Sequence, residues 1–245
     1  MSRQRVVIIV QARMGSSRLP GKVLMDLHGR PLLERQIERL RRSQTADAIV
    51  IATSTHARDD AIAEVAEGLG VGLFRGHEDD VLARYVGAAD AFGADVVVRV
   101  TADCPLIDPE VLDRCVTRLL DDDDLDYVSN TLQRTYPRGL DVEVLRRGVL
   151  DIANDEAADP DDREHVTRFV WRQPERFRLE GEADGEDHSA LRWTVDTQED
   201  LDVVRAVYDD LYPERPDFGY ADALAHAAEH PDVHARNRHV RQKPA

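Results

Sequence analysis

Residues 11–22 combine cationic and small side chains in a pattern that suits an anionic ligand. Gly15 has no Cβ and Ser16 adds a hydroxyl donor, so the backbone could approach an anion closely. The three cations of the stretch are Arg13, Arg18 and Lys22. Because the whole chain has a formal net charge of -16, this uninterrupted basic stretch predicts a polyanionic partner such as a triphosphate. A merely solvated surface loop is the alternative.

The spacing of the stretch excludes two common phosphate-binding motifs. A P-loop requires four residues between its glycines and Ser or Thr after its lysine. Here five residues separate Gly15 from Gly21, and Val23 follows Lys22. The dinucleotide pattern GxGxxG is absent from the sequence.

Two aspartates, Asp103 and Asp196, each follow an apolar segment that could be a buried strand. If both strands belong to one parallel sheet, both carboxylates emerge at the edge that carries the basic stretch. Two carboxylates beside phosphate oxygens suit Mg²⁺, which favours hard oxygen ligands. The alternatives are that Asp103 forms a turn before Pro105 and that Asp196 caps the helix that follows it.

The elements that must position these residues follow an alternating pattern. Nearly continuous β-branched runs at residues 6–10, 48–52 and 96–100 predict buried parallel strands. Helical patterns are predicted at residues 32–42, 59–69, 81–92 and 109–120, the last capped by Asp108. This βαβ series predicts an α/β fold with a doubly wound, mostly parallel sheet.

The second half of the chain is less regular. Strands are predicted at residues 127–131, 140–145 and 191–195, helices at 164–172 and 201–212, and an acidic loop at 180–187. We expect one domain over residues 1–231, with residues 125–190 inserted as an acceptor and dimerisation region. Residues 232–245 show no periodicity and predict a frayed or partner-bound tail.

Composition narrows the functional class. The acidic balance disfavours nucleic acid, and no apolar run approaches a membrane span or a signal-peptide core, so a cytoplasmic enzyme is expected. Only two of the 32 basic residues are lysines, which fits either a GC-rich coding bias or adaptation to a salty cytosol. Cys104 and Cys115 form no CxxC and no Cys/His cluster, so neither a disulfide framework nor a four-ligand zinc site is expected.

Taken in order, these motifs resemble a known family. They are the basic stretch at residues 12–22, the segment from Asp103 to Asp108, and Val195-Asp196-Thr197-Gln198-Glu199-Asp200-Leu201. They are similar to the cytidylyltransferases that activate sugar acids, such as the CMP-Kdo and CMP-sialate synthetases. The closest resemblance is to the branch named after the spore-coat polysaccharide protein SpsF. Residues 76–85, 136–143 and 163–166 support that branch, and the likeness covers residues 6–212.

The resemblance implies a nucleotide-diphospho-sugar-transferase-like fold and several roles. Ala12 and Arg13 would meet the cytosine, Arg18 and Lys22 would hold the triphosphate of CTP, and Asp103 and Asp196 would ligate Mg²⁺. The segment from Arg75 to Arg84 would close over base and ribose. A homodimer formed through the inserted region is also implied.

The acceptor is not carried over from the resemblance. Kdo-type enzymes have a Gln-Gly pair where this chain has Thr101-Ala102. Candidate acceptor contacts are Arg138, Asp141, Glu143 and His165. Alternatively, Glu143 marks a solvent-facing strand position and His165 is a hydrogen-bonded interior histidine.

The expected reaction is in-line attack of a small acidic or sugar-like acceptor on the α-phosphorus of CTP, with release of pyrophosphate. A glycosyltransferase that uses a nucleotide-sugar is the first rival. Its acidic metal-binding pair would come from Asp79-Asp80, Asp122 and Asp124, or Asp159 and Asp161. A catalytically inactive nucleotide sensor is the second rival.

Overall fold

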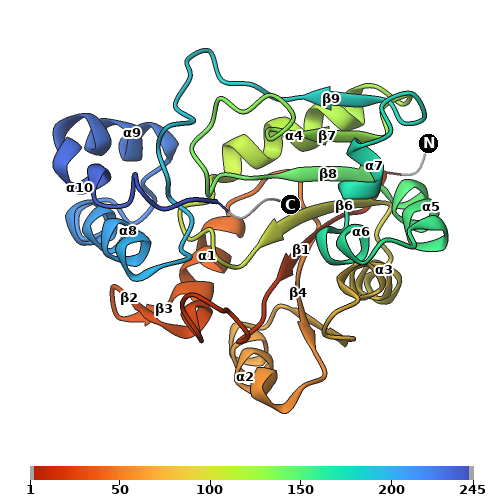
Figure 1. The fold of residues 1–245 in the computed structure, drawn as a ribbon, viewed down its shortest axis with the longest axis horizontal. Coiled ribbons are helices and arrows are strands. Elements are labelled where there is room, and N and C mark those ends of the chain that lie inside the picture. The colour runs from red at the N-terminus through yellow and green to blue at the C-terminus, as the bar shows by residue number, and fades with distance from the viewer. Residues whose placement is uncertain (1–2, 243–245) are drawn as a thin grey trace.

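One mixed sheet forms the centre of the fold in the computed structural model, which describes residues 3–242 (Figure 1). Within these residues the sheet has seven strands. The first four strands in its order run parallel to one another. The sheet order is β5 (Gly72–Gly76), β4 (Ala48–Ser54), β1 (Val6–Gln11), β6 (Val96–Thr101), β8 (Glu143–Arg146), β7 (Tyr127–Ser129) and β9 (Leu179–Gly181). Only β8 runs antiparallel to both of its neighbours in the described sheet. The predicted doubly wound, mostly parallel α/β fold is confirmed.

The interior strand β1 shows why these apolar runs form strands. Val6, Ile8 and Val10 point into one core, and Val7 and Ile9 point into the core on the opposite face. Because both faces are covered, apolar residues continue through the strand instead of alternating with polar ones. Parallel ladders to β4 and β6 satisfy its backbone groups.

Helices cover the two faces of the sheet separately (Figure 1). The first core contains residues of α1 (Leu32–Leu40), α2 (Asp60–Leu69) and α4 (Pro109–Asp121). The second contains residues of α3 (Val81–Phe92), α5 (Arg147–Glu156) and α7 (Arg168–Trp171), beside which lies α6 (Pro160–His165). Asp108 accepts hydrogen bonds from the amides of Glu110 and Val111, which confirms the predicted cap of α4.

A third apolar cluster lies at one end of the sheet. It joins α8 (Gln198–Leu211) and α9 (Tyr220–Glu229) to the neighbourhood of α1, and α10 (Pro231–Ala235) packs beside them (Figure 1). Short elements complete the fold: η1 (Lys22–Leu24), β2 (Asp26–Leu27), β3 (Arg30–Pro31) and η2 (Ala57–Asp59). Among the described residues, no helix combines the length and apolar character that crossing a membrane requires.

The predicted strand at residues 191–195 is wrong. The segment is extended, but its backbone N–H groups bond to two different segments instead of pairing with one strand. Trp193 N and Thr194 N donate to the carbonyl of Arg138, whereas Val195 N donates to the carbonyl of Asp103. Only one isolated bridge, between Arg138 and Arg192, results. Asp196 therefore reaches the sheet edge from an irregular segment.

Other boundaries also differ from the expectation. The strand predicted at residues 140–145 is β8, because the side chain of Asn130 takes the backbone groups of Leu140 and Val142. The helix predicted at 164–172 is two short helices, separated by Val166 at φ 59°. The acidic loop predicted at 180–187 begins inside β9, and β5, α5 and α9 were not predicted.

The predicted C-terminal tail is folded over most of its length. Residues 231–235 form α10, and Val233, His234 and Asn237 are buried. Residues 243–245 of that prediction lie outside the described residues. The expectation of a frayed end is therefore wrong for residues 232–237, because apolar and hydrogen-bonding side chains anchor this segment against the body.

Candidate functional site

Lys22 joins the two aspartates that the sequence singles out. Its Nζ donates to Asp103 Oδ2 at 2.8 Å, to Asp196 Oδ1 at 2.9 Å and to the carbonyl of Val195 at 2.7 Å. The side chain is buried, with 8% of the residue exposed. Gly21, which precedes η1, adopts the left-handed conformation at φ 70°, and this turn directs Lys22 toward the carboxyl edge of the sheet.

Each carboxylate is held by its own local structure. Asp103 follows β6, and its Oδ1 accepts a 2.6 Å hydrogen bond from the hydroxyl of Thr101. Asp196 precedes α8, whose cap is Thr197 in a capping box with Asp200. The alternative that Asp196 caps this helix is therefore wrong, and its carboxylate is available to the site.

The charges of this group are strongly coupled. Burial alone would lower the pKa of Lys22, but the neighbouring carboxylates of Asp103 and Asp196 outweigh burial and raise it. Burial alone would raise the pKa of Asp103, but Lys22 and the hydrogen bond from Thr101 outweigh it and lower that pKa. The aspartate is therefore ionised and the lysine protonated at neutral pH.

Two arginines extend the charged group on the Asp196 side. Arg18 lies 2.9 Å and Arg192 lies 2.7 Å from Asp196 Oδ2. Arg192 also donates to Asp200 at 2.9 Å, and Asp200 in turn accepts from the backbone N–H of Asp196. Asp196 is consequently fixed through both its side chain and its backbone.

The C-terminal segment closes one side of this group. Gln242 accepts a 2.7 Å hydrogen bond from Arg192, and the carbonyl of Arg241 lies 3.3 Å from a guanidinium nitrogen of Arg18. Asn237 donates to the carbonyl of Arg192 and to Asp200, both at 2.9 Å. Figure 1 shows this segment running from α10 back toward the middle of the molecule.

A pocket of about 810 Å³ opens beside Asp103. The predicted site residues from the first half of the chain that line it are Arg13, Arg18 and Asp103. Those from the second half are Arg138, Asp141, Glu143 and His165. The fold therefore brings the basic stretch, one strand-end aspartate and all four candidate acceptor residues to one cavity. Lys22 and Asp196 adjoin it through their contacts with Asp103 and Arg18.

Arg138 and Arg134 differ in how they face the pocket. Arg134 forms a bidentate pair with Asp141, with N–O distances of 2.7 and 2.8 Å. The guanidinium of Arg138 makes no hydrogen bond or ion pair to any other described residue. Burial and the nearby charge of Arg134 lower the pKa of Arg138. Among the described residues, this positive side chain therefore lines the pocket with its guanidinium unpaired.

Glu143 lines the pocket and is buried, so the alternative of a solvent-facing strand position is wrong. It is ion-paired with Arg99, hydrogen-bonded to Thr167, and accepts from the hydroxyl of Tyr127 at 2.7 Å. Burial alone would lower the pKa of Arg99, but Glu143 outweighs burial and raises it. These contacts hold Arg99, Glu143 and Thr167 in place within the pocket lining.

His165 lines the same pocket at the end of α6 and is half-buried. Its ring makes no hydrogen bond to another described residue. The alternative of a hydrogen-bonded interior histidine is therefore wrong, and the ring can contact a ligand in the pocket.

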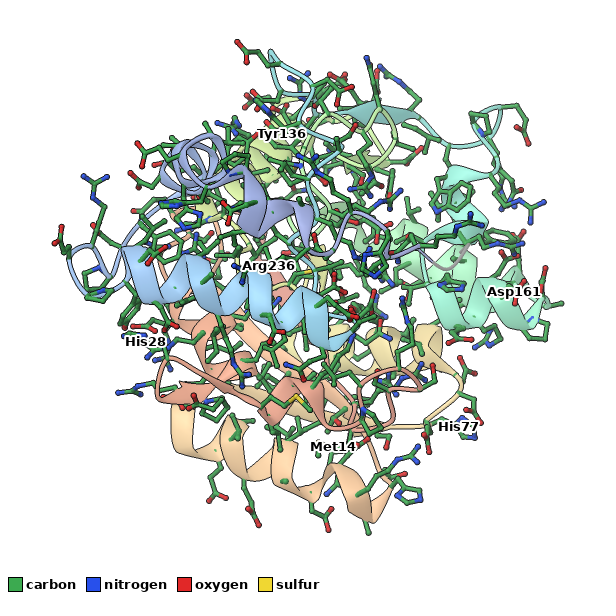
Figure 2. All side chains as sticks on the ribbon, turned by 60° about the vertical axis from the view of Figure 1, so that its left-hand side comes forward. Met14, His28, His77, Tyr136, Asp161 and Arg236 are labelled. Carbon is green, nitrogen blue, oxygen red and sulfur yellow. The ribbon has the colours of Figure 1, made fainter. Side chains whose placement is uncertain are left out.

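The remaining members of the basic stretch are more enclosed. Ala12 is buried, and its N–H donates to the carbonyl of Ala52. Gly15 lies against the guanidinium of Arg58, which a Cβ would meet at 3.0 Å, and Ser16 donates its N–H to the carbonyl of Met14. Figure 2 labels Met14 in this stretch and His77 in the β5–α3 connection, both toward the lower edge of the view.

Arg75 and Arg84 lie outside the pocket lining. Arg75 donates to the carbonyls of Ser54 and His56 and pairs with Asp60 at 2.7 Å. Arg84 is 1% exposed and donates through one nitrogen to two backbone carbonyls, of His77 and Glu78. Its Nε and its other terminal nitrogen have no hydrogen-bond partner among the described residues. A buried guanidinium with unsatisfied donors is costly unless a ligand completes it.

The donor set around Asp103 and Asp196 fits a hard divalent cation. Both carboxylates already approach one ammonium nitrogen within 2.9 Å, so they can share a single positive centre. Carboxylate oxygens and the Thr101 hydroxyl are ligands that Mg²⁺ accepts. All three N–H donors of Lys22 are engaged, so its Nζ must release one of its three acceptors before it can donate to a phosphate.

Three charged residues of the site were not predicted. Arg99 and Arg192 pair with Glu143 and Asp196, and Arg134 pairs with Asp141. Arg99 carried a usable signal, because a charge inside the apolar run of residues 96–100 requires a buried partner. Arg134 and Arg192 gave no such signal among thirty-two basic residues.

Comparison with known proteins identifies relatives of the whole chain. The profile of the family described as “Cytidylyltransferase” matches residues 7–231. The spore coat polysaccharide biosynthesis protein SpsF of Bacillus subtilis is 35% identical over 236 residues, which cover 93% of this chain and 96% of that protein.

Solved structures agree with this assignment. A cytidylyltransferase from Leptospira borgpetersenii superposes with a TM-score of 0.91 at 31% identity, covering 99% of this chain and 100% of that one. A CMP-2-keto-3-deoxy-manno-octonic acid synthetase complexed with CTP gives a TM-score of 0.63 at 22% identity, covering 84% and 98%. This last likeness shows a shared fold and confirms the expected nucleotide-diphospho-sugar-transferase-like architecture.

Proposed function

Because the chain belongs to the cytidylyltransferase family, and is therefore a nucleotidyltransferase, we propose that it transfers CMP from CTP to a small acidic, sugar-like acceptor and releases pyrophosphate. The observation that carries the proposal is the convergence of Lys22, Asp103 and Asp196 beside a pocket that holds a free arginine. The similarity to SpsF, a spore coat polysaccharide biosynthesis protein, and to the cytidylyltransferase from Leptospira borgpetersenii supports the same reaction class.

The basic stretch would hold the triphosphate. Arg18 and Lys22 both contact Asp196, and both can exchange a carboxylate for a phosphate oxygen. Arg84 would serve the base and ribose side, because its buried guanidinium has unsatisfied donors and Arg13 of the basic stretch is close enough to influence its charge. Contacts of Ala12, Gly15 and Ser16 with the nucleotide remain predictions from the family pattern.

Asp103 and Asp196 would hold Mg²⁺. When bound, the ion supplies charge neutralisation on the phosphates and polarises the phosphorus under attack. Lys22 and Arg18 would stabilise the negative charge of the departing pyrophosphate. Thr101 and Arg192 would orient the two carboxylates through the hydrogen bonds that they already make.

The acceptor would enter between the arginines and Glu143. Arg138 offers an unpaired guanidinium to a carboxylate or phosphate, and His165 lies on the same cavity wall. A carboxylate or phosphonate acceptor arrives ionised, so the reaction does not require a strong general base. Asp141 is held by Arg134 and is suited to accept a hydroxyl hydrogen bond.

The aspartates proposed as metal ligands for the alternative glycosyltransferase function make other contacts. Asp80 caps α3 and pairs with Arg163, and Asp159 caps α6. Asp122 lies at the end of α4 and accepts from the amide of Asp124. These aspartates serve helix ends rather than the pocket.

The decisive experiment measures pyrophosphate release from four nucleoside triphosphates, each offered with a panel of sugar acids, sugar phosphates and phosphonates in Mg²⁺. We expect release that depends on both CTP and one acidic acceptor. Asp103→Asn serves as the matched inactive control, with its fold checked by circular dichroism. Release of a nucleoside diphosphate from a nucleotide-sugar, or normal turnover by the Asp103→Asn variant, would contradict the proposal.

Two further expectations stay predictions. The dimer through residues 125–190 can be tested by light scattering on the purified protein, and a monomer at all concentrations would contradict it. Calorimetry with CTP, GTP, ATP and UTP would measure the preference for cytosine.

A further inference from the structure

Three histidines at four-residue spacing lie outside the site described above. His226 is in α9, His230 follows its end, and His234 is in α10. Asp210 of α8 approaches them, with its Oδ2 2.9 Å from His226 Nε2. Figure 2 shows α8 across the front of the molecule, with Arg236 marking the residue directly after α10.

Asp210, His226 and His230 present one ligand atom each toward a common point. These three atoms lie within 4.8 Å of one another. In a tetrahedral zinc site, with bonds of about 2.0–2.2 Å, neighbouring ligand atoms are about 3.3 Å apart. The side chain of Asp210 is 53% exposed and His230 is half-buried, so both can rotate. Their rotation can shorten the distances between the ligand atoms to those of a zinc site.

The chemical class of the ligands selects the ion. Two imidazoles and one carboxylate suit Zn²⁺ and similar transition-metal ions, whereas Mg²⁺ prefers oxygen ligands. The ring nitrogens of His230 make no hydrogen bond to any described residue, so this ligand is not committed elsewhere. A fourth position remains for water.

We propose that Asp210, His226 and His230 form a binding site for one Zn²⁺-type ion that links α8 to α9. The site is separate from Asp103 and Asp196 in ligand set and in preferred metal. The inference does not depend on the proposed function, because it rests on residues that the proposed reaction does not use.

The hydrogen bonds of the cluster fix which ring nitrogen of His226 and of His234 carries the proton in the metal-free protein. The indole N–H of Trp193 can only donate, and it lies 3.2 Å from His234 Nδ1. His234 is therefore protonated at Nε2, which lies 3.0 Å from His226 Nδ1 and donates to it. His226 is in turn protonated at Nε2 and donates to Asp210.

Metal binding at His226 Nε2 reverses this chain. The metal occupies Nε2, so a neutral His226 carries its proton on Nδ1 and donates it to His234 Nε2. A neutral His234 then carries its proton on Nδ1, and the indole N–H of Trp193 loses its acceptor. Each ring keeps one proton, so the proton count balances. Because Trp193 is fully buried, loss of this bond changes the surroundings of its indole.

This consequence gives the experiment two independent readouts. The full-length protein, freed of metal with a chelator, is titrated with Zn²⁺ in excess Mg²⁺ so that oxygen-rich sites are occupied. Calorimetry should show one ion per chain with a micromolar or lower Kd. In a Trp171→Phe background, which leaves Trp193 as the chain's remaining tryptophan, indole fluorescence should change and saturate at the same equivalence point.

Matched variants decide whether the three residues are the ligands. His230→Ala and Asp210→Asn should each weaken Zn²⁺ binding at least tenfold and abolish the stoichiometric fluorescence change. His28→Asn is the control, because His28 also pairs with an aspartate of α8, Asp209, at 3.0 Å but has no second histidine ligand. This control should bind Zn²⁺ as the unaltered protein does.

The proposal is overturned by any of three results: absence of stoichiometric Zn²⁺ binding, multiple weak sites only, or unchanged affinity in both ligand variants. Circular dichroism of each variant separates a lost ligand from a lost fold. If His230→Ala fails to fold, Asp210→Asn decides alone, because Asp210 is exposed at the surface.

Discussion

The side-chain amide of Asn237 donates a 2.9 Å hydrogen bond to Oδ1 of Asp200, a fully buried carboxylate. Asp200 also accepts from the backbone of Asp196 and pairs with Arg192. The C-terminal segment thereby reaches the residues that hold one of the two site carboxylates. The position of Asp196 consequently depends on residues about forty positions further along the chain.

Asn237→Ala should lower both stability and turnover. The change leaves the carbonyl of Arg192 without its buried donor and removes one of two donors to Oδ1 of Asp200, a cost of about 1–3 kcal/mol. Urea unfolding and steady-state kinetics measure the two effects. Asn237→Asp should be more damaging than Asn237→Ala, because it places a second carboxylate beside Asp200. A tolerated Asn237→Asp would contradict this arrangement.

Lys22→Met should destabilise the protein and weaken CTP binding. Removal of one partner leaves Asp103 and Asp196 facing each other without their shared ammonium, a cost of about 3–5 kcal/mol for breaking a buried pair. Lys22→Arg keeps the charge and should retain more stability. Thermal unfolding and calorimetry with CTP provide the measurements, and equal stability of Lys22→Met and the parent protein would refute the coupling.

Arg138→Ala should raise the KM for the acidic acceptor and leave the KM for CTP nearly unchanged. A hydrogen bond to a charged group contributes about 1.5–3 kcal/mol, so a rise of about tenfold or more is expected. Arg168→Ala is the control, since Arg168 pairs with Asp159 and Asp162 away from the pocket lining. An equal effect of both variants would argue against anion binding by Arg138.

Gly139→Ala and Gly148→Ala should act in opposite directions. Gly139 has φ 107°, and a Cβ there would lie 2.5 Å from Thr194 N, so strain and overlap together should cost about 3 kcal/mol. Gly148 lies in α5 with nothing within 4 Å of an added Cβ. Its replacement should stabilise by about 0.5–1 kcal/mol through helix propensity. Melting temperatures of the two variants test this, and matching shifts would contradict it.

The ion pair of Asp80 with Arg163 should make a pH-dependent contribution to stability. Burial would raise the pKa of Asp80, but Arg163 and the N–H of Ala83 outweigh it and lower that pKa. The stabilisation is therefore complete above the unfolded-state pKa of about 3.9 and is lost as pH falls through the lower folded-state pKa.

Asp80→Asn retains a capping side chain and loses only the charge, so we expect about 0.2–1 kcal/mol of destabilisation at neutral pH. Urea unfolding at neutral pH and near pH 4 measures whether the difference from the parent persists down to the unfolded-state pKa. Asp79→Asn removes a neighbouring exposed charge and is the matched control. If the stability difference between Asp80→Asn and the parent already vanishes between neutral pH and pH 5, the pKa of Asp80 is not lowered in the folded protein and the prediction is refuted.

The sequence alone determined the features whose causes are local. The apolar run of residues 6–10 has to be covered on both faces, and it does form an interior strand of the sheet. Asp108 followed by proline specifies the start of α4 through its own side chain and ring. The basic stretch and the strand-end Asp103 were recognisable because the position directly after a buried strand places them at the sheet edge.

The pairing of charges at the site depends on how distant segments pack together. Lys22 contacts Asp196 across a separation of 174 residues, and no periodic pattern in the sequence indicates that contact. Residues 191–195 resemble a strand, yet their amides bond to two remote carbonyls, and the aperiodic C-terminus folds because remote groups accept its side chains. Short-range patterns fix dihedral preferences, whereas pairing between distant segments depends on the whole packed arrangement.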